Sequence, residues 1–184
     1  MTAASASSYK MCELLLKNGA RPNATNRHRV TALMLAAQQN KNNNNFRICK
    51  LLLAHGANDR QSALSGATAL AYAAKTRKLK LMRLLMLKGS KVNKQDNDGN
   101  SVLHRVIPCS NMLLRFLINK GADVNAVNNI GLTPLMLACS YTSEGNALVL
   151  AQAGAKFVVG CQSAWNYANQ AVVDHLERNG FIEP

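Results

Sequence analysis

The chain has 184 residues, of which 48% are hydrophobic and only 5% aromatic, and its formal net charge is +13. This apolar content suffices for one domain or one continuous repeat stack, and a core of Ala, Leu and Met favours packed helices over a β-sandwich. No run approaches 18 apolar residues, and no basic region followed by an apolar stretch opens the chain, so the sequence indicates neither a membrane span nor a signal peptide.

Leucine-rich segments that end in a glycine recur along the chain. Their glycines lie at positions 19, 56, 89, 121 and 154, at spacings of 37, 33, 32 and 33 residues. A glycine can close a helix because it adopts the left-handed conformation without strain. The pattern therefore predicts a helix that ends at each glycine. The segments are LLLKNGA (14–20), LLLAHGA (51–57), LLMLKGS (84–90), FLINKGA (116–122) and the weaker LAQAGA (150–155).

A second marker precedes four of these glycines, those at 56, 89, 121 and 154, by roughly two dozen residues. A Thr or Ser at this marker caps a helix with its hydroxyl, and Pro134 fits the first helical turn, where no amide hydrogen is needed. Each repeat is therefore expected to hold two helices. The markers are TALM (31–34), TALA (68–71), SVLH (101–104) and TPLM (133–136).

These two marks, recurring in phase, resemble the ankyrin-repeat family over nearly the whole chain. The resemblance implies an all-α solenoid of stacked helix-turn-helix units with β-hairpin-like fingers, in a single domain over 1–184. The expected repeats are 1–25 (partial), 26–62, 63–95, 96–127, 128–157 and 158–184.

Three parts of the chain depart from a regular repeat. The first repeat is expected to begin within a first helix, which predicts that the chain is a section of a larger ankyrin-repeat protein. Residues 42–45, a run of asparagines, predict a longer loop between the helices of the second repeat. The last repeat is predicted to be a C-terminal cap, with a first helix over 163–168 and a more polar second helix over 171–180.

Charge is distributed unevenly between the two halves. Residues 1–94 hold 17 Lys and Arg against two acids, which gives 17 − 2 = +15, whereas residues 95–184 hold five bases and seven acids, which gives 5 − 7 = −2. A merely solvated face usually mixes charges of both signs, so the first half is expected to meet an acidic partner.

The resemblance implies binding positions at the finger tips and at the ends of the first helices, which line a concave groove. An acidic protein segment is the favoured ligand because charge would steer it to the basic end. The positions expected to bind the partner are Arg27, His28, Gln38, Gln39, Lys75, Thr76, Asn97, Asp98, Asn129, Ile130, Ser140 and Tyr141.

A basic patch is predicted in addition, largely along the second helices. It leaves nucleic acid open as an alternative partner, held through its phosphates within a larger assembly. Base stacking is poorly supported, because aromatic residues are scarce in this half. The patch residues are Arg47, Lys50, Lys75, Arg77, Lys78, Lys80, Arg83, Lys91 and Lys94.

No motif predicts catalysis, a metal site or a cofactor, and no small-molecule substrate is indicated. The resemblance implies a structural role for His104, which ties adjacent repeats by hydrogen bonds.

Five cysteines without a CxxC pair indicate free thiols, so we expect an intracellular protein, cytoplasmic or nuclear. The chain is thus expected to be a non-catalytic interaction scaffold. A further alternative is a targeting domain whose enzyme lies outside this chain.

Overall fold

A computed structural model describes the chain except residues 40–43, 108–110, 142, 160–161 and 182–184. The side chains of Val159, Gln162 and Trp165 are likewise not described. The chain forms two compact units, Met1–Lys91 (the first unit) and Val92–Pro184 (the second unit). The division falls just after the last helix of the first unit, and each unit is considered by itself.

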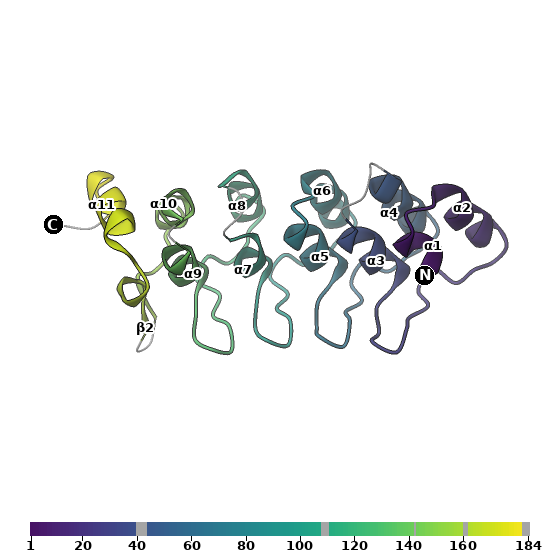
Figure 1. Ribbon diagram of the computed structural model, residues 1–184, viewed down its shortest axis with the longest axis horizontal. Coiled ribbons are helices and arrows are strands. Elements are labelled where there is room, and N and C mark those ends of the chain that lie inside the picture. The colour runs from purple at the N-terminus through teal and green to yellow at the C-terminus, as the bar shows by residue number, and fades with distance from the viewer. Residues whose placement is uncertain (40–43, 108–110, 142, 160–161, 182–184) are drawn as a thin grey trace. The chain divides into compact units, whose positions relative to one another are not determined.

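The first unit consists of three helix pairs. The first helices of the pairs lie in one row and the second helices in another, and long loops extend from the first-helix row (Figure 1). This is the predicted arrangement of helix-turn-helix repeats with fingers. The pairs are α1 (Thr2–Ser5) with α2 (Tyr9–Lys17), α3 (Ala32–Gln38) with α4 (Asn44–Ala54), and α5 (Ala69–Lys75) with α6 (Leu79–Leu87).

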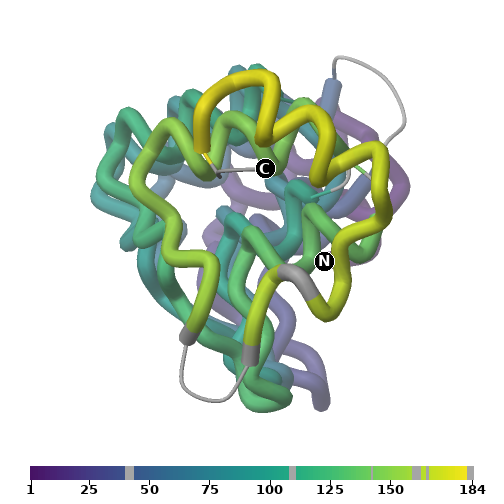
Figure 2. The backbone as a smooth tube through the Cα atoms, turned by 90° about the vertical axis from the view of Figure 1, so that its left-hand side faces the viewer, coloured from purple at the N-terminus to yellow at the C-terminus, as the bar shows by residue number. Residues whose placement is uncertain are grey.

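The second unit continues the same pattern and ends in a modified repeat. Its pairs are α7 (Val102–Val106) with α8 (Asn111–Ile118), and α9 (Pro134–Ser140) with α10 (Glu144–Gln152). The last repeat holds β1 (Val158–Val159), β2 (Gln162–Ser163), the 3-10 helix η1 (Ala164–Asn166) and α11 (Gln170–Arg178). Figure 2 shows α11 and this two-stranded hairpin at opposite ends of the repeat.

The first helices begin where the capping residues predict. The hydroxyls of Thr31, Thr68 and Thr133 accept hydrogen bonds from the backbone N–H three residues later, at 3.2, 3.3 and 3.2 Å. Ser101 forms a reciprocal capping box with His104. Each cap satisfies an N–H group that the helix itself leaves without an acceptor.

Antiparallel bridges close the fingers of the first unit. Thr25 pairs with Thr31, and Ser62 pairs with Thr68. At the turn, Arg29 has a φ of 56°, in the left-handed region that Gly66 occupies in the next finger at 78°. Arg29 therefore carries backbone strain at a position that favours glycine.

An asparagine four residues after the closing glycine joins neighbouring repeats within each unit. Asn23 donates to the Gly56 carbonyl at 2.9 Å and accepts from the Asn58 N–H at 2.6 Å. Asn93 binds Gly121 and Asp123 in the same way, at 2.9 Å each. These contacts satisfy backbone groups at the helix ends, where the intrahelical ladder leaves carbonyls open.

Small residues allow the helices of each unit to pack closely. Ala36, Ala37, Ala73 and Ala74 are completely buried, and the leucines of the second helices fill the remaining space. The core therefore consists of aliphatic side chains between the two rows of helices, as the composition predicts.

Two local expectations are corrected. Asn44 and Asn45 belong to the first turn of α4 and not to a loop. Asn45 is buried, and its side-chain amide donates to the Gln39 carbonyl at 2.8 Å. Residues 42 and 43 lie outside the described part. The helix expected over 163–168 is only the three-residue turn η1, because the chain arrives there from β2.

Candidate partner-binding site

The finger tips of the first unit expose the residues predicted to bind a partner. Arg27 and His28 are both exposed, and the Arg27 Nε donates to the His28 Nε2 at 3.1 Å. The backbone N–H of Leu64, in the next finger, donates to the His28 carbonyl at 2.9 Å. The two tips therefore lie side by side and present one surface.

Leu64 and Ser65 are missing from the predicted site although both are exposed, Leu64 at 53%. They stand four and three residues before Thr68, as Arg27 and His28 stand before Thr31. The repeat phase was therefore a sufficient signal to find them. An exposed leucine beside the tip that carries Arg27 and His28 offers an apolar anchor for a bound segment.

The first-helix ends of the first unit divide into exposed and structural residues. Gln38 and Lys75 are exposed at the ends of α3 and α5. Thr76 is half-buried, and its hydroxyl lies 3.0 Å from the Ala37 carbonyl of the neighbouring repeat. Gln39 is half-buried, and its carbonyl accepts from Lys78 of the neighbouring repeat at the same junction. Gln38 and Lys75 thus remain available to a partner, whereas Thr76 joins two repeats.

Lys78 is also part of this junction. Its Nζ donates to the carbonyls of Ala37, at 3.2 Å, and Gln39. Burial lowers the pKa of Lys78, and an interaction with Cys49 opposes that shift. The ammonium satisfies carbonyls at the C-terminal end of α3, where the helix dipole favours a cation. Lys78 therefore acts within the fold and contributes less to a free basic surface than its sequence neighbours.

Replacing Lys78 by methionine is expected to destabilise the first unit by about 1–2 kcal/mol, because two carbonyls lose a charged donor. Lys75→Met is the matched control, since Lys75 is exposed and should change stability by less than about 0.5 kcal/mol. Hydrogen exchange of amides in α3 and α5 measures the difference. Equal protection in the two variants would contradict the structural role of Lys78.

The other basic-patch residues of the first unit are exposed. Arg47 and Lys50 lie on α4, and Lys80 and Arg83 lie on α6. Two further cations, Arg77 and Lys91, are exposed outside the helices. Lys94 is exposed too, but it belongs to the second unit.

Arg47 also borders a cleft of about 460 Å³ between the beginnings of α2 and α4. Its guanidinium lies 4.4 Å from the centre of the Tyr9 ring. This cation–π contact covers one face of the Tyr9 ring, so that face is not open to a nucleobase.

The second unit presents a less basic version of the same surface. Ile130 and Tyr141 are exposed at 73% and 56%, and Ser140 is exposed at the end of α9. The Asn129 side chain donates to the Asn97 carbonyl at 2.7 Å, and its backbone N–H donates to the Asp98 carbonyl at 3.0 Å. Asn129 thus joins two fingers, whereas Ile130 and Tyr141 are available to a ligand.

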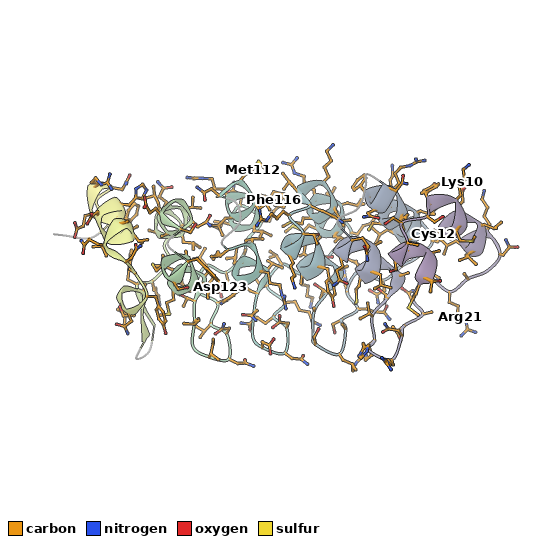
Figure 3. The ribbon with its side chains drawn as sticks, in the orientation of Figure 1. Lys10, Cys12, Arg21, Met112, Phe116 and Asp123 are labelled. Atoms are coloured by element: carbon orange, nitrogen blue, oxygen red, sulfur yellow. The ribbon has the colours of Figure 1, made fainter. Side chains whose placement is uncertain are left out.

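A different exposed residue of the second unit lies on the outer helix row. Met112 is 63% exposed on α8, while Asp123 lies nearer the base of a finger (Figure 3). Met112 is therefore on the side opposite the finger tips and does not extend the predicted groove.

The described thiols are poor nucleophiles. Burial raises the pKa of Cys49 to about 12 and that of Cys139 to about 11, and it also raises the pKa of Cys12. A thiol with a raised pKa is protonated at neutral pH and unreactive.

No group of three or more His, Cys, Asp or Glu side chains able to hold a metal occurs among the described residues. Within the same residues, no helix is long and apolar enough to cross a membrane.

Capped helix pairs that stack in register and expose hairpin fingers define a repeat protein of the helical solenoid class. The family model for ankyrin repeats in three copies matches residues 1–96 and again residues 72–160. The chain belongs to the ankyrin-repeat family. Ankyrin repeats generally mediate protein–protein interaction, and the family is typically non-catalytic.

A similar protein is FPV234 of Fowlpox virus (strain NVSL), described as an ankyrin repeat protein. The two are 35% identical over 77 residues, which are 39% of this chain and 17% of that protein. The match therefore spans a small part of the relative's length.

Proposed function

We propose that this protein is a non-catalytic adaptor that binds an acidic segment of a partner protein along the fingers and first-helix ends of its first unit. The proposal rests mainly on charge. Removing Lys94 from the 17 bases of residues 1–94 leaves 17 − 1 = 16 in the first unit, against two acids, Glu13 and Asp59. So few carboxylates cannot neutralise this unit, and an acidic ligand would relieve its self-repulsion.

Both acids of the first unit already have partners inside it. Asp59 is buried and accepts a hydrogen bond from the Ser90 hydroxyl at 2.5 Å. Glu13 pairs with Lys17 at 3.6 Å on the outer helix α2. The side that carries Arg27 and Lys75 therefore holds exposed cations beside the exposed Leu64. Such a surface fits a segment with acidic side chains around one apolar anchor.

The free thiols of Cys12, Cys49 and Cys139 favour a reducing compartment for this interaction, so we propose an intracellular setting.

A labelled synthetic peptide, rich in glutamate around one phenylalanine, tests the proposal by fluorescence anisotropy. Arg27→Glu combined with Lys75→Glu is expected to weaken binding about tenfold at low salt, because the like charge repels the peptide. Raising the salt concentration should weaken binding of the unaltered protein more than binding of the variant. Both residues are exposed, so the fold should tolerate the change.

Lys50→Glu combined with Lys80→Glu is the matched control, with the same change in charge on the second helices. Equal loss in both double variants would overturn a groove-specific site. A single-stranded RNA probe provides the other arm. If the Lys50→Glu and Lys80→Glu double variant loses RNA binding while the double variant of the groove residues retains it, a nucleic acid held through its phosphates is favoured as the partner instead.

A further inference from the structure

The cleft of about 460 Å³ between the beginnings of α2 and α4 is lined mainly by polar and charged side chains. Ser7 and Ser8 line it from the turn between α1 and α2, and Asn44 and Arg47 line it from the first turns of α4. None of the residues proposed above to bind the acidic segment contributes to this lining. The cleft is therefore a second surface of the first unit, with its own chemistry.

The hydroxyl of Ser7 is an unpaired buried group in the wall of this cleft. Ser7 is 8% exposed, and its Oγ has no hydrogen-bond partner among the described residues. Burying a hydroxyl without a partner costs free energy, so such groups are rare in proteins. The turn itself does not require the burial. Arg77 stands two residues before α6, as Ser7 stands before α2, with nearly the same φ (60° against 58°), yet Arg77 is exposed. The Ser7 hydroxyl is thus free to donate to a ligand.

The charges around the cleft favour an anion. Lys10 and Arg47 line it as cations and Glu13 lines it as an acid, which gives 2 − 1 = +1 among the described lining residues. Lys10 is exposed on α2, in the outer row of helices (Figure 3). The Arg47 guanidinium lies over the Tyr9 ring at 4.4 Å, which limits its freedom before any ligand binds. Glu13 lies 3.6 Å from Lys17, and this pairing weakens its repulsion of an anion.

The beginning of α2 adds hydrogen-bond donors on the same side. Its N-cap residue, Ser8, makes no side-chain hydrogen bond to the helix. The Cys12 N–H donates to the Ser8 carbonyl at 3.1 Å as the first bond of the helix, so the amides of residues 9–11 have no acceptor within it. These amides carry the partial positive charge of the helix N-terminus. Together with the unpaired Ser7 hydroxyl and the two cations, they form a set of donors that converges on the cleft.

We propose that this cleft binds a phosphate group, either inorganic phosphate or the phosphate of a small monoester. The Ser7 hydroxyl and the amides of α2 donate to its oxygens, while Lys10 and Arg47 balance its charge. Phosphate fits better than carboxylate, because its three or more acceptor oxygens can meet donors from α2, from the turn before it and from α4 at once. A small ligand is favoured over a polynucleotide, because Glu13 would repel the neighbouring phosphates of a nucleic acid.

Titration of the full, ¹⁵N-labelled chain with inorganic phosphate at constant ionic strength tests the proposal. The NMR signals of the Lys10 and Met11 amides should move and reach saturation. Ser7→Ala should weaken binding about tenfold, because one hydrogen bond to a charged ligand is lost while the charge of the protein stays the same. Arg47→Met should weaken it to a similar extent. Ser7→Gly should behave like Ser7→Ala, and since glycine adopts a φ of 58° without strain, this second variant separates loss of binding from loss of the fold.

Two control variants separate the cleft from a general attraction of anions to the basic unit. Ser5→Ala removes an exposed hydroxyl of α1, and Lys50→Met removes an exposed cation of α4 one turn after Arg47. Neither residue lines the cleft, so each change should alter the affinity for phosphate by less than about twofold. A parallel titration with O-phosphoserine distinguishes the two sources of the phosphate group. Tighter binding of O-phosphoserine indicates a monoester, and equal binding indicates inorganic phosphate.

Three results would count against the phosphate site. The first is a set of shifts that grow in proportion to the phosphate concentration without saturation, because the attraction is then diffuse. The second is equal affinity of Ser7→Ala and Ser5→Ala, which would show that the buried hydroxyl takes no part. The third is a single-stranded RNA probe whose binding depends on Ser7 and Arg47 while neither phosphate nor O-phosphoserine binds, because the ligand would then be a nucleic acid.

Discussion

Replacing Arg105 by methionine is expected to destabilise the second unit by about 3 kcal/mol. The Asp96 side chain is 2% exposed and forms an ion pair with the Arg105 guanidinium. It also accepts from the backbone N–H groups of Asp98, at 3.0 Å, and Asn100, at 2.8 Å. Removing the arginine leaves a buried carboxylate without a countercharge, which costs far more than an exposed pair.

The measurement is urea unfolding followed through Trp165, the single tryptophan of the sequence, which belongs to the second unit. Arg115→Met is the matched control, because Arg115 is exposed and its guanidinium donates to the Gln152 side chain at 3.2 Å. It should cost less than about 0.5 kcal/mol. Arg105→Met with Asp96→Asn should recover part of the loss, because the amide is neutral. Equal midpoints for Arg105→Met and Arg115→Met would contradict the buried pair.

The consequence for binding follows from the position of Asp96 in the finger. Its carboxylate fixes the turn that carries Asn97 and Asp98, two of the predicted partner-binding residues. Arg105 acts on this turn through the Asp96 carboxylate, so its loss should loosen the tip. Faster exchange of the Gly99 amide, which donates to the Asp96 carbonyl at 3.0 Å, is the expected sign of this loosening.

Replacing His104 by alanine is expected to cost the second unit about 2–3 kcal/mol at pH 7.5. The His104 Nε2 lies 3.0 Å from the Leu132 carbonyl, which only accepts, so Nε2 carries the proton. Nδ1 is then an acceptor, and the Ser101 N–H donates to it at 3.2 Å. Alanine removes both hydrogen bonds, of which the one from Ser101 is half of the capping box, and it removes a buried ring.

The same residue predicts a pH dependence. Burial lowers the pKa of His104, and Arg105 adds to that effect, while the Leu132 carbonyl and Asp96 oppose it. Because the folded-state pKa is below the unfolded value of about 6.5, the unfolded chain binds the proton first as pH falls. Stability is therefore retained above about pH 6.5 and declines below it, down to the folded-state pKa.

Urea midpoints of the second unit at pH 7.5 and pH 5 measure this effect. The unaltered protein should lose more stability on acidification than His104→Ala does. His55→Ala is the control, because His55 is exposed and belongs to the first unit. If the unaltered protein and His104→Ala lose stability in parallel, His104 is not the group that titrates.

Much of the candidate site was predictable because it follows the repeat phase. The finger tips and first-helix ends occupy fixed positions relative to the capping Thr or Ser, so Arg27, Ile130 and Tyr141 are exposed where that phase puts them. Leu64 was within reach of the same argument. Thr76, Lys78 and Asn129 were not distinguishable by phase, because their roles depend on carbonyls that lie roughly 30 to 40 residues away in the sequence.

The sequence by itself determined the helix pairs, their caps, the fingers and the concentration of positive charge in the first half. These features depend on residues within one repeat, whose spacing fixes local backbone structure. Only the tertiary structure decided which polar side chains are used to join repeats and which remain available to a partner. It also decided that Met11 and Leu15 are exposed where Ile48 and Leu52 are buried. Burial depends on whether a neighbouring repeat covers a position, and nearly identical local sequences therefore have different exposures.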